Sequence, residues 1–436
     1  MNFTLVRTLV TRFDVPQSFF NNVACIMIAN AVNNATIFAT NIIIARMYGQ
    51  DFFGVFSIAV NIALLTLSVS EFGMNYSMIR LYKKYLDDPV KSRAVLLTNF
   101  YFKSFMLLFL IGLGIAFGQI LAAVLMHDAE RWMLAAVAIA SGGILGLWSF
   151  IRAFFQAVER FKAIAVQTII YALLRMSLLG TLLLWQNTTS EELLLLAVYS
   201  LPLTLILWWG IAQLKHRVNI FQIGSHDLIS AGSECIRYSS WIAMGSVSFV
   251  LIQQSLIFIV SIIGGVKEVA LLSAGLVFTA VFSLINDAIC QVLFSKLAGL
   301  PRNRIGEYRR RLLRLTPLFA LGSLVIIVAL SATMLLLLGD KYTKSLPIFW
   351  ISSIGTALTA CMGYYSMVMH TIQRPQIGAY VNFSTLVCFC LCGVVLMKYV
   401  SLISVVVAYV VALATGELVK SILVNRAVLE PGGTEV

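Results

Sequence analysis

The sequence has very little charge for its length. Of its 436 residues only 11% are Asp, Glu, Lys or Arg, whereas soluble domains usually carry about 25% charged residues. Hydrophobic residues make up 60% of the chain, and the mean hydropathy is +0.92. So few charges could not cover so much apolar surface in water, which excludes a soluble enzyme, a disordered chain and a nucleic-acid-binding domain. The composition predicts an all-α integral membrane protein that crosses the bilayer many times.

Motifs of catalysis and metal binding are also missing. The chain has no Walker A sequence and no G-x-S-x-G, and its four histidines are scattered. Cys388, Cys390 and Cys392 resemble a metal cluster, but helical geometry places the first and third on one face and Cys390 roughly opposite. We therefore expect no enzymatic activity, no bound metal, no cofactor and no ATP-driven transport by this chain alone.

Most of the chain consists of long apolar segments. A window of about 20 residues, the length that crosses about 30 Å of hydrocarbon, predicts twelve membrane-spanning helices. They cover residues 21–45, 53–76, 94–117, 132–154, 163–185, 191–214, 240–263, 268–292, 313–338, 346–369, 377–397 and 400–424.

The positions of the basic residues predict the orientation, because cationic loops stay on the cytoplasmic side. With the N-terminus inside, about 23 of the 31 Lys and Arg residues fall in cytoplasmic segments, including the dense run 302–314. About six fall outside, and Lys103 and Arg175 remain within spans. We expect both termini to be cytoplasmic, so most of the net charge of +12 encodes topology rather than binding of nucleic acid.

The chain is predicted to divide into two lobes of six helices. The longest polar stretch between spans is cytoplasmic, and six is an even number, so both lobes enter the membrane in the same direction and form a parallel repeat. The predicted parts are an interfacial segment (1–20), an N-lobe (21–214), a cytoplasmic linker (215–239), a C-lobe (240–424) and a cytoplasmic tail (425–436).

An internal repeat supports these two lobes. A shift of 216 residues aligns Gly49 with Gly265 and Glu71 with Asp287. In both copies an amide follows the acid by four residues and a base follows it by nine. The agreement at nearly constant offset favours a duplicated six-helix unit over coincidence.

Two segments resemble a known family. The stretch NIIIARMYGQDFFGVFSIAVNIALLTLSVSEFGMNYSMIRLY (41–82) resembles the first two helices of bacterial oligosaccharide-lipid flippases. There an apolar helix and a short glycine turn precede a helix that opens with G-x-F/Y and ends near an Arg. The segment LLLLGDKYTKSLPIFWI (335–351) is similar to the turn between helices nine and ten of that family.

The family is that of the Wzx-type flippases for O-antigen or capsule units, in the superfamily of the MATE exporters and the lipid II flippase. The resemblance implies two lobes around a central cavity and alternating access. It also implies export of an undecaprenyl-diphosphate-linked oligosaccharide across the bacterial inner membrane for polysaccharide biosynthesis. Membrane lipids, and the polymerase and chain-length regulator of the same pathway, are the expected partners, with a proton or Na⁺ left open as coupling ion.

Charged residues inside spans are the sharpest candidates for substrate binding, because each costs about 2.5–3.5 kcal/mol at the bilayer centre on insertion scales. Arg175, one turn after Tyr171, could bind a diphosphate with its planar guanidinium or make a hydrogen bond between helices of the N-lobe. Arg46, which matches an Arg of lipid II flippase relatives, Lys103 and Arg152 have the alternative of extending to the interface.

Buried amides and acids form the remaining candidates. Asn30, Asn33 and Asn34 share one helical face, and Gln253 and Gln254 lie on the first helix of the C-lobe. They could bind sugar hydroxyls or hold helices together. The candidates for ion coupling or gating are Glu71, Asp287 and Glu417. The alternative for these acids is a structural pair with Lys103, Arg152, Arg80 or Lys296.

Three other functions compete with the flippase. A MATE-like ion-coupled exporter of cationic drugs would share the architecture but favour an acidic cavity, which Arg175 opposes. A membrane-bound glycan polymerase or ligase would need large external loops, and the predicted ones are short. A scaffold without transport activity would be insensitive to changes in the cavity.

Overall fold

The computed structural model describes residues 17–184, 190–215, 224–298, 302–371, 376–396 and 401–429. In these ranges the chain is helical apart from short turns, as the composition predicts. The long helices are α2 (Gln17–Met47), α3 (Gly49–Glu71), α5 (Pro89–Leu121), α6 (Trp132–Ala157), α7 (Phe161–Leu183), α9 (Leu201–Lys215), α10 (Ser225–Ala298), α11 (Arg302–Leu338), α12 (Ser345–Thr371), α13 (Gln376–Leu396) and α14 (Leu402–Leu429). The short elements are α4 (Met74–Lys84), η1 (Ala122–Met126), η2 (Ala129–Arg131), α8 (Glu191–Leu195), η4 (Leu196–Ser200) and η6 (Asp340–Tyr342).

The number of membrane crossings agrees with the sequence. The described residues contain 11 helices that are long and apolar enough to span a bilayer. One of them, Ile242–Asn286, is 45 residues long and covers most of two predicted spans, 240–263 and 268–292. Its helix is interrupted at Gly265, where φ is 76° and ψ is −176°. With that break counted, the prediction of twelve spans is confirmed.

The break at Gly265 also has a counterpart in the first half of the chain. Gly49, which the shift of 216 residues aligns with Gly265, has a φ of 86° and is the first residue of α3, directly after the turn that follows α2. Both positions adopt a backbone conformation that side chains with a Cβ rarely tolerate. The sequence repeat therefore corresponds to the same turn between successive spans in each half.

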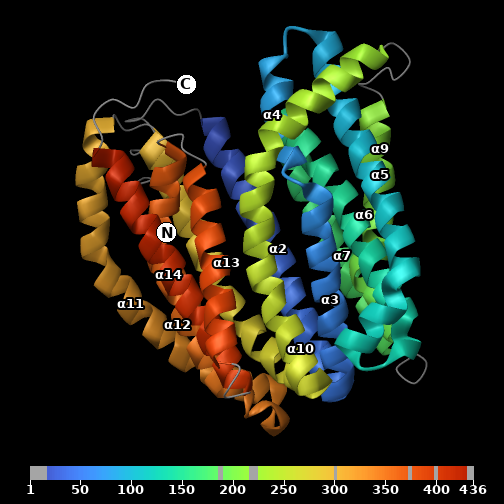
Figure 1. Cartoon of the computed structure of the whole chain (residues 1–436), viewed down its shortest axis with the longest axis vertical. Coiled ribbons are helices and arrows are strands. Elements are labelled where there is room, and N and C mark those ends of the chain that lie inside the picture. Colours follow the sequence, from blue (N-terminus) through green and yellow to red (C-terminus); the bar gives the residue numbers. More distant parts are fainter. Residues whose placement is uncertain are drawn as a thin grey trace.

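The helices form two groups joined by α10 (Figure 1). The blue and green helices α3, α5, α6, α7 and α9 lie on one side, and the orange and red helices α11 to α14 lie on the other. The start of α10 packs on α4 and α5, and the helix then runs between the groups, in contact with α3, α12 and α13. The helix α2 packs mainly on α7, so it belongs to the first group.

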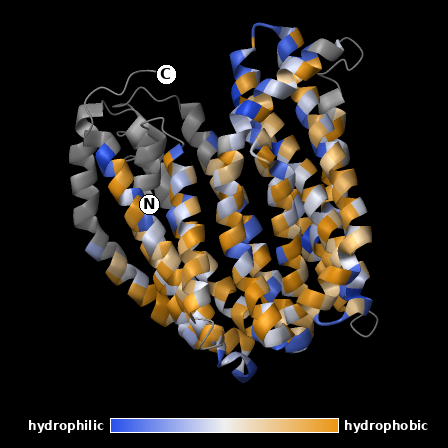
Figure 2. Cartoon of the chain, viewed as in Figure 1, coloured by the Kyte–Doolittle hydropathy of each residue, from blue (hydrophilic) through white to orange (hydrophobic). Residues whose placement is uncertain are grey.

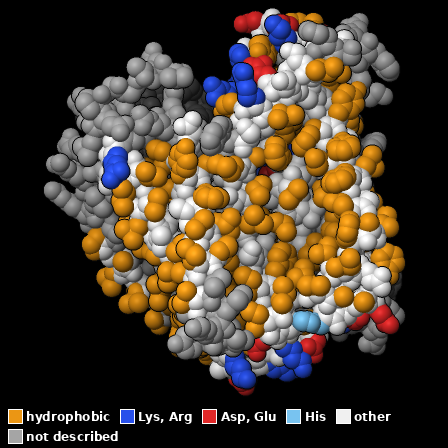
Figure 3. Space-filling view, viewed as in Figure 1, with side chains coloured by type: hydrophobic (Ala, Val, Ile, Leu, Met, Phe, Trp, Pro, Cys, Tyr) orange, Lys and Arg blue, Asp and Glu red, His pale blue; other side chains and the backbone are white. Residues whose placement is uncertain are grey.

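Polar and charged side chains gather at the two ends of the bundle. Hydrophobic residues cover the middle of the helices (Figure 2), and on the face shown in Figure 3 nearly all Lys, Arg, Asp and Glu side chains lie near the ends. We call the end that contains α4 the basic end and the opposite one the η6 end. This distribution is that of a multi-pass membrane protein. The cytoplasmic location of the basic end stays a prediction.

Glycines on α6 bring this helix close to α3. A Cβ on Gly142 would collide with the carbonyl of Ala63, and a Cβ on Gly146 would collide with the hydroxyl of Ser70. The absence of side chains at these positions lets the two helices approach backbone to backbone. This contact fixes the relative position of the polar residues at the end of α3 and on α6.

The predicted span 53–76 is in fact two helices. The helix α3 ends at Glu71, and α4 begins at Met74 after Phe72 (φ 40°) and Gly73 (φ 65°). A hydropathy window does not detect such a break because both sides of it are apolar. The consequence is that Glu71 occupies the last residue of α3, at the basic end.

Candidate functional site

Arg175 lies between α7 and α2 and is completely buried. Its Nη2 donates to the backbone oxygen of Asn33 at 2.9 Å, to Asn33 Oδ1 at 3.1 Å, and to the hydroxyl of Thr36. Its Nε and Nη1 have no hydrogen-bond partner among the described residues. Arg175 therefore joins two helices and retains donors that a further acceptor could use.

Aromatic rings connect Arg175 with Arg152. The guanidinium carbon of Arg175 lies 4.9 Å from the ring centre of Tyr171, whose ring lies 5.1 Å from that of Trp148. Trp148 in turn lies 4.9 Å from the guanidinium carbon of Arg152. Cations over aromatic faces are stabilised by the ring quadrupole. The four side chains form one continuous row, which we call the cation–aromatic row.

The row extends toward the basic end into a polar cluster. Glu71 Oε1 accepts a hydrogen bond from Asn75 Nδ2 at 3.2 Å, and the same amide nitrogen lies 3.0 Å from the hydroxyl of Ser149. The carboxylate of Glu71 attracts both Lys103 and Arg152. Lys103 is only 1% exposed, and its ammonium has no hydrogen-bond partner among the described residues. Two cations therefore share one acid, and the polar cluster carries an excess of positive charge.

The amides predicted on α2 do not all have the same role. Asn33 accepts the hydrogen bonds of Arg175, whereas Asn30 and Asn34 are half-buried and make no side-chain hydrogen bond with another described residue. On α10, Gln253 is exposed and Gln254 is buried, with its Oε1 unpartnered in the described part of the chain. The structure thus brings Arg175, Tyr171 and Asn33 together but not the two glutamines.

The remaining predicted residues lie elsewhere. Arg46 is exposed at the η6 end, and its Nη1 lies 3.5 Å from the backbone oxygen of Leu337. Glu417 is buried and accepts a hydrogen bond from Lys420 at 2.6 Å. The side chain of Asp287 lies outside the described residues, so the predicted symmetry with Glu71 stays a prediction.

Sequence reasoning missed two partners that it could have found. Trp148 precedes Arg152 by four residues, as Tyr171 precedes Arg175, and side chains at this spacing meet on one helical face. Lys420 follows Glu417 by three residues, which also makes them neighbours. The contact between Trp148 and Tyr171 gave no such signal, because it joins two different helices.

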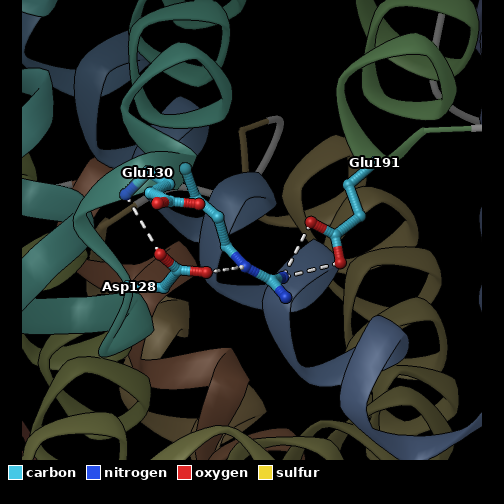
Figure 4. A network of polar contacts seen from close by, with 4 residues as sticks. Asp128, Glu130 and Glu191 are labelled. Carbon is cyan, nitrogen blue, oxygen red and sulfur yellow. Dashed lines mark hydrogen bonds and ion pairs between the residues drawn. The ribbon is translucent and has the colours of Figure 1, made fainter.

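An ion-pair network at the η6 end is separate from this site (Figure 4). Arg131 Nη1 donates to both carboxylate oxygens of Glu191, at 2.6 and 2.7 Å, and Arg131 Nε donates to Asp128 at 3.0 Å. The backbone nitrogen of Glu130 also donates to Asp128. The network fastens η2 to α8, and it pairs one cation with two carboxylates. We assign it a structural role.

Comparisons with known proteins identify the family. The family model described as polysaccharide biosynthesis protein matches residues 19–298. The chain belongs to this family. The match includes the first of the two resembling segments (41–82), whereas the second (335–351) lies beyond it. The resemblance to this family is confirmed. A search of curated protein sequences found no match.

Solved structures of other proteins confirm the fold of this chain. The lipid II flippase MurJ in an inward closed conformation is similar with a TM-score of 0.72 and 14% identity, over 92% of this chain and 88% of that chain. An inward-facing multidrug resistance MATE transporter has a TM-score of 0.68 and 13% identity, over 91% and 95%. The eukaryotic MATE transporter AtDTX14 has a TM-score of 0.62 and 16% identity, over 95% and 97%. At these identities the likeness establishes the fold.

Proposed function

We propose that the protein is a flippase that moves an undecaprenyl-diphosphate-linked oligosaccharide from the cytoplasmic to the outer leaflet of a bacterial inner membrane. The family match supports a role in polysaccharide biosynthesis. The fold supports movement of a substrate between two helical groups, as its relatives include a lipid II flippase and MATE transporters. No enzymatic step is part of this proposal.

The positive charge of the buried residues is the observation that supports an anionic substrate. Among the described residues of the spans, three charged side chains are at most 5% exposed: Lys103, Arg175 and Glu417. Glu417 is paired with Lys420, whereas Lys103 and Arg175 form no salt bridge with any described residue. Buried cations that form no salt bridge suit a diphosphate and oppose a cationic drug.

The cation–aromatic row gives the site a specific shape. The guanidinium of Arg175 lies over the ring of Tyr171. One of its two terminal nitrogens, Nη2, donates hydrogen bonds to Asn33 and Thr36. The remaining nitrogens, Nε and Nη1, have no partner among the described residues, and each can donate a hydrogen bond to a phosphate oxygen. Arg175 is the residue to which we assign phosphate binding, and Tyr171 and Asn33 are positioning residues.

The experiment is a test of glycan delivery in cells that lack their own flippase. The wild-type chain should restore surface glycan, Arg175→Ala should abolish it at normal protein level, and Arg175→Lys should retain part. Ser177→Ala is the matched control, because Ser177 is exposed on the same helix and its hydroxyl bonds only to the backbone of Leu174. Full delivery by Arg175→Ala would remove Arg175 from the mechanism.

A drug-efflux assay on the same strains separates the alternative. A MATE-like exporter would lower the accumulation of cationic drugs and would leave surface glycan unrestored. That pair of results would contradict the proposed function.

A further inference from the structure

An apolar groove runs along the first group of helices, and no residue of the cation–aromatic row lines it. It encloses about 610 Å³, within the range of about 300–1,000 Å³ that ligand pockets occupy. Four long helices and the short η1 contribute to it, and its walls include Ile62, Val69, Leu110, Phe117, Ile139 and Phe258. Phe117 is 50% exposed and Val69 is 42% exposed, so the groove opens at the surface of the protein rather than forming a closed cavity.

The walls of the groove accept only hydrocarbon. Thr66 is the one lining residue with a polar side chain, and its hydroxyl donates to the backbone oxygen of Ile62 at 2.8 Å. No polar group of the lining side chains is therefore left for a sugar or an ion. The groove lies within the membrane-spanning parts of α3, α5, α6 and α10, where an alkyl or isoprenoid chain is the available occupant.

The length of the groove exceeds one leaflet. Its lining runs along α5 and η1 from Leu110 to Leu125, which corresponds to about 22 Å of helix axis at 1.5 Å per residue. One leaflet contributes about 15 Å of the roughly 30 Å of hydrocarbon. An acyl chain of a phospholipid remains within its own leaflet. A chain that follows this wall throughout extends past one leaflet, as the long chain of a polyisoprenoid can.

The groove ends beside the polar cluster of Glu71, Lys103 and Arg152. Val69 precedes Glu71 by two residues on α3, and Lys103 precedes Leu110 by about two turns on α5. The polar cluster has two cations and one acid, so its excess charge complements a phosphate. Because hydrocarbon gains little by leaving lipid for an apolar groove, the charged end supplies the preference for one class of lipid.

From these observations we propose that the groove binds the polyisoprenyl chain of the lipid-linked substrate, with the phosphate end directed toward the polar cluster, from which the cation–aromatic row leads to Arg175. This inference rests on the proposed function for the identity of the lipid. The chain stays in the groove at the membrane surface while the headgroup enters between the two groups of helices. The groove thereby keeps the tail out of the path that the sugars follow.

Photocrosslinking of the full chain tests the occupant. A photoreactive phenylalanine analogue replaces Phe117 in the groove or, as the control, Phe109, which is also 50% exposed on α5 but does not line the groove. The protein is placed in phospholipid nanodiscs that contain undecaprenyl phosphate, and adducts are identified by mass. We expect a polyprenyl adduct at position 117 that is several-fold enriched over position 109.

Two results would overturn the groove assignment. Equal polyprenyl adducts at both positions would indicate contact with bulk lipid, and phospholipid adducts alone at position 117 would indicate a membrane-lipid site. If either result occurred while the chain still restored glycan delivery, only the groove assignment would fail. An enriched adduct in a chain that does not restore delivery would instead overturn the proposed function and leave the polyisoprenyl site standing.

Filling the groove provides a second measurement. Leu113→Trp places a larger side chain among the lining residues, whereas Ile115→Trp changes a residue of the same helix that is 67% exposed and lies outside the groove. Delivery and the adduct at position 117 should both fall in Leu113→Trp at normal protein level and persist in Ile115→Trp. Unchanged adduct formation in Leu113→Trp would contradict the proposal.

Discussion

Lys103 and Glu71 occupy one polar cluster but should affect stability in opposite directions. The ammonium of Lys103 is desolvated and has no hydrogen-bond partner among the described residues, whereas Glu71 is the shared counter-charge of Lys103 and Arg152. Lys103→Met should raise the free energy of unfolding by about 1–3 kcal/mol, the cost of a buried unsatisfied group. Glu71→Gln should lower it, because two cations then lack an acid.

Thermal unfolding of both variants in one detergent measures these changes, with Lys420→Met as a control that breaks the ion pair of Glu417 instead. A lower melting temperature for Lys103→Met would contradict the prediction, since it would mean that the ammonium is stabilised in the folded protein. Glycan delivery, measured in parallel, should fall in Lys103→Met even though the protein is more stable. Such a cost in stability is typical of residues that are retained for function.

For single residues, the sequence predicts which side chains are candidates for function better than it predicts which other side chains they contact. Arg175 and Lys103 stand out because charge is rare in spans, and Tyr171 could be added from its spacing. The contact of Arg175 with Asn33 joins residues 142 positions apart, and no local pattern encodes it. Both hypotheses for Arg175 describe part of its environment, because one nitrogen joins helices and two others remain without a partner.

Packing between α3 and α6 depends on glycine at position 142. A Cβ there would collide with the carbonyl of Ala63 and lie 2.6 Å from Thr66 Cβ. Gly142→Ala should therefore destabilise the protein by about 1–3 kcal/mol, as overpacked cores do. Gly112→Ala is the matched control on α5, where a new Cβ meets nothing within 4 Å. It should be neutral or stabilise by up to about 1 kcal/mol through helix propensity.

Melting temperatures of the two alanine variants decide this prediction. Equal destabilisation by both would show that backbone flexibility, not helix contact, determines the effect.

The boundaries of the helices are harder to predict from the sequence than their number. Apolar runs reveal how many spans exist, whereas contacts of glycine and breaks such as Phe72–Gly73 depend on neighbouring helices or backbone torsions that hydropathy does not report.

The start of α10 is attached to α4 through Glu234. This carboxylate accepts hydrogen bonds from Lys84 Nζ at 2.8 Å and from the hydroxyl of Tyr85 at 2.7 Å. The hydrogen bond from Lys84 is the largest cause that lowers the pKa of Glu234 below its ordinary value of 4.5. The contribution of the carboxylate is therefore present above that ordinary value and is lost as pH falls through the lower folded value.

Hydrogen exchange of the segment 225–240 measures this attachment as a function of pH, after correction for the intrinsic exchange rate. Protection at pH 7 should exceed protection below pH 4, and Glu234→Gln should show the low-pH level at both values. Arg237→Gln, three residues further along the same helix, leaves both hydrogen bonds in place and removes only a smaller electrostatic contribution to the carboxylate, so it serves as the comparison. A pH dependence that survives in Glu234→Gln would assign the effect to another group.

Contacts between the two halves of the chain concentrate at the η6 end. Gln50 Nε2 donates to the backbone oxygen of Lys341 at 2.6 Å. The hydroxyl of Tyr342 donates to the backbone oxygen of Ala45 at 3.1 Å. The ring of His127 lies 2.7 Å from the backbone oxygen of Ser261. At the basic end, α4 and α5 instead contact only the first part of α10 through the hydrogen bonds that the described residues make. The structure is therefore held together at the η6 end.

Gly54 offers a way to loosen that end. It lies on α3, where a Cβ would collide with the carbonyl of Val266 and lie 2.6 Å from Val266 Cγ1, one residue after the break in α10. Gly54→Leu should act as a wedge and shift the population toward a state that is open at the η6 end, because packed interfaces change between discrete arrangements rather than deform continuously. Gly322→Leu on α11 is the control, since nothing lies within 4 Å of its Cβ position.

Spin labels at Met47 and Leu336, which are 51% and 78% exposed near the η6 end of α2 and α11, report the separation of the halves. Gly54→Leu should add a population at longer distance, and Gly322→Leu should retain the wild-type distribution. If the wedge leaves the distances unchanged while the protein remains folded, the contacts at this end do not form a gate. If the longer population appears and glycan delivery falls, closure of the η6 end is required for turnover, because a flippase that stays open on one side can bind its substrate but cannot complete the cycle.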